Sequence, residues 1–294
     1  MTTQQVIFGA WDWEPSVLIG CAALLVGYWV EVRPVATRAT PRAALFVTGV
    51  VLLLLALISP IDVLGDGYLF SAHMFQHLLL VLAVPPLLLL GIPARAFERL
   101  VRWTPADRVE RALGRPLLAW ALGMGTLWVW HVPALYDLAL RSQGVHILQH
   151  LCFLVSATIF WWPVIAPLPG RKRLPSLGAV AYLVAAGLAS SLLGIIITLA
   201  PLGLYPAYLH PVDRLGLLPL IRGRGQGQWN FSALADQQLG GLLMWTLSSP
   251  VYLLASSIAL ARWYRESDQD EEIEVPLAQE TPRMAATPGR GGGG

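Results

Sequence analysis

The stretch from Leu177 to Leu199 reads LGAVAYLVAAGLASSLLGIIITL and contains no charged residue. A helix needs about 20 mostly apolar residues to cross the hydrocarbon core of a bilayer, because it rises about 1.5 Å per residue. Inside the bilayer each backbone N–H and C=O must also be hydrogen-bonded without water, and a single helix satisfies its own groups. The stretch therefore predicts a membrane-spanning helix.

Six further apolar segments of comparable length accompany it. They cover about residues 15–32, 43–58, 69–91, 117–133, 146–166 and 237–261. Over all 294 residues, 55% are hydrophobic and 13% are charged, whereas soluble domains contain about 25% charged residues. We expect an all-α, polytopic bundle of seven transmembrane helices over residues 1–265, embedded in a lipid bilayer.

Lys and Arg residues indicate the orientation of this bundle. Fourteen of the twenty follow spans one, three, five and seven in the short connections there, whereas the opposite connections contain only Arg141, Arg214, Arg222 and Arg224. Basic residues accumulate on the cytoplasmic side of membrane proteins. We therefore expect the N-terminus outside and the C-terminus in the cytoplasm. The first 14 residues contain no Lys or Arg, so the first segment is expected to stay as a span rather than act as a cleaved signal.

The remaining parts of the chain suggest little chemistry. Residues 266–294 are acidic and then rich in Gly, and they are expected to form a disordered cytoplasmic tail. Residues 200–236 form the longest outer connection and contain His210. The only cysteines, Cys21 and Cys152, lie in apolar segments. They exclude a disulfide framework and a CxxC metal pair. No nucleic-acid partner is expected.

Five of the six histidines lie at the predicted outer ends of spans. His73 and His77 form HMFQH, His146 and His150 form HILQH, and His131 ends the fourth span in WHVP. An i, i+4 pair places two imidazoles on one helix face, and all five lie at a similar predicted depth. Neutral imidazole is a ligand for zinc, copper, iron and nickel. The pattern predicts one metal site at the outer end of the bundle.

Five other side chains lie near the predicted histidine level. Asp236 begins the seventh span and is expected to bind the metal or to accept a hydrogen bond from a ligating imidazole. Asp62 and Asp66, between the second and third spans, are expected to be solvated or to cap a helix. Thioethers can bind copper(I), but Met74 is expected to pack against other side chains, as is Met244 at the same level.

Several short motifs resemble the CtaG-like cytochrome c oxidase assembly factors of the multi-span, Bacillus type. The resemblance extends over about residues 10–262, and no motif carries it alone. The matching residues are Ser59 to Asp62, Ser71 to His77, Pro85 to Leu87, Gly91 to Pro93, Trp130 to Tyr136, His146 to His150, Phe160 to Pro163, Asp236 to Gly241 and Trp245.

The resemblance implies a multi-pass protein of the bacterial plasma membrane that assists assembly of a haem-copper oxidase. It implies copper as the metal and oxidase subunits as partners. On this interpretation the protein is not an enzyme, and no catalytic residue is assigned. Two alternatives remain open. One is a seven-span zinc hydrolase that acts on lipids, in which three histidines and a carboxylate activate water. The other is an electron carrier with haem between paired histidines.

Overall fold

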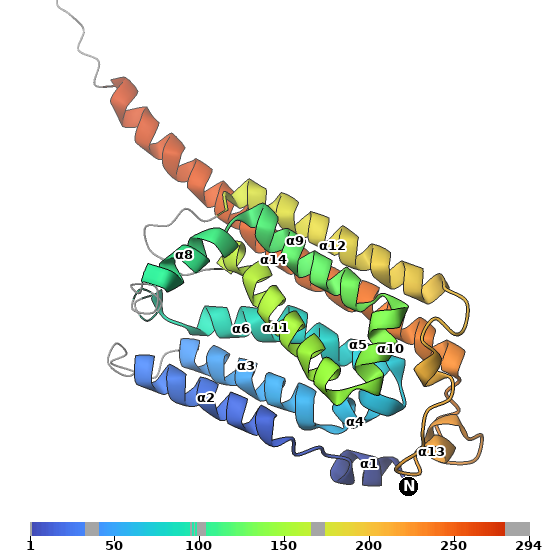
Figure 1. Ribbon diagram of the computed structural model, residues 1–294. Helices are drawn as coiled ribbons and strands as arrows, with labels where there is room; N and C mark the ends of the chain where they lie inside the picture. The colour runs from blue at the N-terminus through green and yellow to red at the C-terminus, as the bar shows by residue number, and fades with distance from the viewer. Residues whose placement is uncertain are drawn as a thin grey trace, which may run out of the picture.

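The computed structural model describes residues 2–32, 41–94, 96, 98, 104–165 and 174–279, which form helices and connections without a strand (Figure 1). The all-α prediction is confirmed for these residues. The helices are α1 (Thr3–Gly9), α2 (Pro15–Val32), α3 (Pro41–Ile58), α4 (Pro60–Gly67), α5 (Phe70–Leu78), η1 (Leu79–Ala83), α6 (Val84–Gly91), α8 (Thr104–Leu113), α9 (Pro116–Trp130), α10 (Pro133–Arg141), α11 (Gln143–Ile165), α12 (Ser176–Leu199), η2 (Pro206–Tyr208), α13 (Leu218–Arg222) and α14 (Ala233–Gln279).

Five of the predicted spans are long and apolar enough to cross a membrane within the described residues. They are Pro41–Ile58, Phe70–Gly91, Gln143–Ile165, Ser176–Leu199 and Ala233–Asp268, and the bent pair α9 and α10 adds a sixth if the two helices form one span. The apolar part of α2 is shorter. The seventh span and the orientation stay predictions, and several of the basic residues behind the orientation lie outside the described residues: Arg33, Arg38, Arg95, Arg99, Arg102, Arg171, Lys172 and Arg173.

The long helices form one bundle in which α5 and α11 lie between two helix pairs (Figure 1). On one side α2 packs on α3, and on the other α12 packs on α14, while α5 contacts α14. Gly194 and Gly241 let α12 and α14 touch, because a Cβ on Gly241 would lie 2.7 Å from the carbonyl oxygen of Gly194. The helices α4, α10 and α13 gather at one end, near α1, and the last turns of α14 lie at the other.

Polar and apolar side chains are distributed as in a membrane protein. Large apolar side chains such as Leu188, Leu199 and Leu254 are mostly exposed on α12 and α14, whereas His73, Gln76 and Gln149 are fully buried. Exposed apolar surface of this kind suits lipid rather than water. Ionisable and polar groups at membrane depth usually face the bundle interior and indicate function.

The helix is irregular after the first histidine pair, because of a proline in the sequence. Pro85 lacks the N–H that would bond the carbonyl of Val81 four residues earlier. The backbone widens into the π-helical turn η1 at this point, and Trp161 Nε1 of α11 donates to the Val81 oxygen over 2.9 Å. This bond joins the two helices that carry the histidine pairs, because the freed carbonyl needs a donor.

The fourth predicted span, 117–133, ends in a sharp bend. Helix α9 ends at Trp130, and α10 begins at Pro133 with its axis turned by 73°. Val132 takes an extended conformation, as residues before proline prefer. The bend places His131 in the corner between the two helices.

Helix α14 extends into the region that was expected to form a disordered tail. Helix α14 continues through Gln279, whereas the tail was expected from residue 266. Residues 266–275 contain neither Gly nor Pro and are rich in Glu, which has a good helix propensity. Residues 280–294 lie outside the described residues.

Candidate metal centre

Asp236 holds the start of α5 in place. Leu69 precedes this helix and has no side-chain acceptor, so the first amides of α5 need another partner. The Asp236 carboxylate accepts from the amide of Phe70 over 2.7 Å, from the amide of Ser71 over 2.9 Å and from the Ser71 hydroxyl over 2.6 Å. Asp236 therefore caps α5 from α14. It fixes the helix that carries His73 and His77, and it is not among the side chains whose ligand atoms converge.

The structure brings the five predicted histidines into one continuous cluster. The ring centroids of His73 and His77 are 4.2 Å apart, and those of His146 and His150 are 4.1 Å apart. The pairs face each other, since the His73 centroid lies 5.1 Å from that of His146 and 5.9 Å from that of His150. His131 joins through His77, at 5.9 Å between centroids. All five side chains are buried or nearly so.

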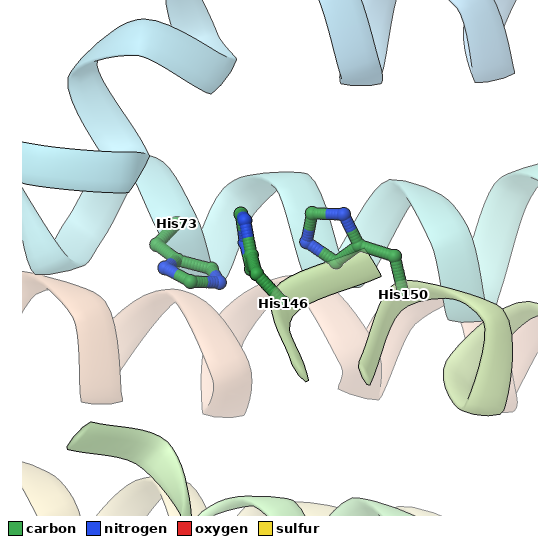
Figure 2. A group of neighbouring side chains, drawn as sticks. All are labelled: His73, His146 and His150. Carbon is green, nitrogen blue, oxygen red and sulfur yellow. The ribbon is translucent and has the colours of Figure 1, made fainter. Parts of the chain in front are cut away.

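Three of these imidazoles form a compact triad (Figure 2). One ring nitrogen from each of His73, His146 and His150 can be chosen so that all three lie within 4.8 Å of one another. A tetrahedral ion bound at about 2.0 Å needs nitrogens about 3.3 Å apart, so small rotations of the rings suffice. The triad joins α5 to α11, and we call it the histidine triad.

Hydrogen bonds set the tautomer of His73. Its Nδ1 lies 2.8 Å from the Tyr208 hydroxyl, which itself donates to the carbonyl oxygen of Gly65 over 2.7 Å. Burial raises the pKa of Tyr208 far above its usual value, so the hydroxyl keeps its single proton. Because that proton is given to Gly65, His73 Nδ1 must be the donor to Tyr208. In the neutral ring the lone pair is then on Nε2, which is buried without a partner.

Asp66 sets the tautomer of His146 in the same way. Its Oδ1 lies 2.8 Å from His146 Nδ1, and a carboxylate accepts the proton of that nitrogen. The Nε2 atom of His146 is again buried without a partner, as is Nε2 of His150. A carboxylate behind a histidine is the usual support of a metal ligand. The expectation that Asp66 is only solvated or a cap was therefore incomplete. Its i, i+4 spacing from Asp62, close to the first histidine pair in the sequence, was the signal that could have indicated a role at the site.

Two cavities lead from the surface to the triad. One, of about 380 Å³, is lined by Asp12, Glu14, Asp62, Asp66, His146 and His150 together with apolar residues of α2, α3 and α11. The other, of about 760 Å³, is lined by Asp12, Asp62 and Asp66, by His146 and by the loop that contains His210. Carboxylates in a cleft concentrate cations. We call the shared region around Asp12, Asp62 and Asp66 the acidic vestibule.

A comparison with protein families supports the resemblance noted in the sequence. The model of the cytochrome c oxidase caa3 assembly factor family matches residues 26–266. The chain belongs to this family. The match includes Asp236 and all five clustered histidines, so the triad lies within the part of the chain that the caa3 assembly factors share.

Relatives of this chain occur in mycobacteria. An uncharacterized protein of Mycobacterium leprae is 26% identical over 284 residues, which is 90% of this chain and 40% of the relative. Uncharacterized proteins of Mycobacterium bovis and Mycobacterium tuberculosis are each 26% identical over 275 residues, or 86% of this chain and 40% of the relative. The chain thus spans about two-fifths of the length of these relatives. No solved structure matches the chain significantly.

Asp62 gives the acidic vestibule a pH-dependent charge. Burial raises its pKa from 3.8 to about 7, and the nearby carboxylates of Asp66 and Asp12 add to the increase. The hydrogen bond that Gln76 Nε2 donates to Asp62 Oδ1 opposes it, as does His146. Below pH 7 the vestibule therefore loses one of its negative charges.

Replacing Asp62 with asparagine should flatten the pH dependence of stability. The folded carboxyl keeps its proton up to about pH 7, whereas the unfolded one ionises near 3.8. Stability is therefore lost as the pH rises between these values, by as much as about 4 kcal/mol. Thermal unfolding of both proteins in detergent from pH 5 to 8 measures this. We expect the wild-type midpoint to fall across that range and the Asp62→Asn midpoint to exceed it at pH 8. Parallel curves would contradict the assignment.

Proposed function

We propose that the chain binds copper at His73, His146 and His150 and assists its insertion into a haem-copper oxidase in the bacterial plasma membrane. Copper is the cargo in this role, and no catalytic residue is required. Family membership supports the oxidase as the partner. The observation that supports a metal as the cargo is the set of three buried Nε2 atoms without a hydrogen-bond partner.

The tautomers of His73 and His146 favour metal binding over a purely structural role. A buried polar atom without a partner is costly, and such atoms are few in native proteins. Asp66 and Tyr208 each bind the Nδ1 side of an imidazole and thereby direct the lone pair of Nε2 into the cluster. Imidazole suits copper. The rings of the triad are also so close that one small ion fits their geometry better than a haem macrocycle.

The acidic vestibule supports delivery from the outer side. His146 lines both cavities and belongs to the triad, so a cation attracted by the aspartates meets a triad ligand first. The predicted orientation places this end of the bundle outside the cytoplasm. Two further histidines adjoin the triad, which gives a bound ion spare ligands during transfer.

Oxidase assembly in cells tests the proposal. A strain that lacks the chromosomal gene would receive wild-type protein, His150→Ala or His210→Ala, and the copper-to-haem ratio of its purified oxidase would be measured. We expect wild type and His210→Ala to restore the ratio and His150→Ala to leave it low. His210 is the matched control because it is an exposed histidine that lines the wider cavity but does not belong to the triad.

Two results would overturn the proposal. One is a normal copper-to-haem ratio with His150→Ala when membrane levels of the variants are equal. The other is a purified protein that holds zinc and hydrolyses lipids, or that shows a haem Soret band, without binding copper.

A further inference from the structure

A second group of possible metal ligands lies beside the triad, on the side facing α14. It contains two thioethers, Met74 on α5 and Met244 on α14, and two imidazoles, His77 and His131. All four side chains are at most 4% exposed and line the same small cavity. The volume of this cavity, about 10 Å³, is close to the least that holds one water molecule. It is enclosed by α5, the corner after α9, α12 and α14.

His131 directs a lone pair at a sulfur atom. Its Nδ1 lies 2.6 Å from the carbonyl oxygen of Leu127, which can only accept, so Nδ1 is the donor. In the neutral ring Nε2 then has a lone pair and no proton. This Nε2 lies 3.3 Å from Met74 Sδ, which is also an electron-pair donor. Neither atom has a proton to donate, so the two atoms cannot form a hydrogen bond with each other.

The spacing of these two atoms fits one metal ion. For a nitrogen–sulfur distance of 3.3 Å, an ion about 2.0 Å from nitrogen and about 2.3 Å from sulfur would have a bond angle of about 100°. That angle is close to tetrahedral, and the atoms would not need to move.

His77 supplies a third ligand and connects this group to the triad. Both of its ring nitrogens are buried without a partner. Its ring centroid is 5.9 Å from that of His131 and 4.2 Å from that of His73. It lines the small cavity. The neutral ring has a lone pair on only one nitrogen, so His77 can bind an ion in either group but not in both at once.

We propose that Met74, His77 and His131, with Met244 beside them, form a second metal site that is selective for copper(I). Thioether sulfur is a soft ligand that prefers copper(I) over zinc and over harder ions. This inference deepens the proposed function and rests on it for the identity of the cargo. Copper received at the histidine triad passes through His77 to the thioether site, which retains it in the reduced state until transfer.

X-ray absorption at the copper edge tests the second site on purified, full-length protein loaded with copper(I) under reducing conditions. Wild type is expected to bind two copper(I) ions and to show a copper–sulfur shell. Met74→Leu preserves the size and apolar character of the side chain, and it should lose that shell and one of the two ions. Met124→Leu is the matched control, because Met124 is buried on α9 and does not line the cavity.

His150→Ala separates this inference from the proposed function. It should remove the triad ion and leave the copper–sulfur shell intact. A wild-type spectrum without sulfur, or one that Met74→Leu leaves unchanged, would overturn the second site while leaving the triad standing. If His150→Ala bound as much copper as wild type, that result would instead contradict copper binding at the triad.

Discussion

Purified His150→Ala protein should bind copper more than about 100-fold more weakly at the triad than wild type, because loss of a residue that merely supports a ligand already costs about 10- to 100-fold. His150 supplies one of the three converging nitrogens. Its Nε2 has no other partner, so the substitution removes a ligand without breaking a hydrogen bond of that atom. His73→Ala should have a similar effect on copper, with an additional loss of stability because Tyr208 loses its donor.

Competition with a chromophoric copper chelator measures these affinities. His210→Ala again serves as control and should match wild type. Equal copper affinity in wild type, His73→Ala and His150→Ala would show that the triad is not the binding site.

Replacing Asp236 with alanine should destabilise the protein by about 3–5 kcal/mol, because a lost helix cap and several buried donors without partners each contribute about 1–2 kcal/mol. Three hydrogen bonds to Phe70 and Ser71 disappear together. The first turn of α5 would then loosen, and His73 with it. We therefore expect weaker copper binding, although Asp236 does not belong to the triad.

Asp236→Asn is the matched variant for this test. It keeps one oxygen that can accept from the amides of α5 and should lose about half as much stability as the alanine variant. Thermal unfolding in detergent, followed by copper titration at a temperature where both variants are folded, separates the two effects. An alanine variant as stable as wild type would contradict the capping role.

Local sequence patterns were sufficient for the long helices and for part of the site. Length and hydropathy predicted α3, α11, α12, α14 and the span that begins with α5, because a bilayer imposes the same minimum on every helix that crosses it. The i, i+4 spacing placed each histidine pair on one face, since that property depends on the helix alone. The 73° turn after Trp130 was not predicted.

The roles of the carboxylates could not be predicted from spacing. Asp66 and His146 are 80 residues apart and meet only because α4 and α11 reach the same end of the bundle. Asp236 was expected to bind the metal or support an imidazole, and its capping of α5 was not predicted, because the amides that it caps lie 166 residues away in the sequence. Both outcomes depend on which helices are neighbours, and no local pattern contains that information.

The apolar stretch from Leu177 to Leu199 and its counterparts determined that this chain is a helical membrane protein with histidines at one end. The sequence by itself also placed those histidines at a common depth, because every span must cover the same thickness. Only the tertiary structure decided that His73, His146 and His150 converge, and that Met74 meets His131 rather than merely packing. Convergence depends on the order and rotation of helices in the bundle, and these are set by side-chain packing between segments far apart in the chain.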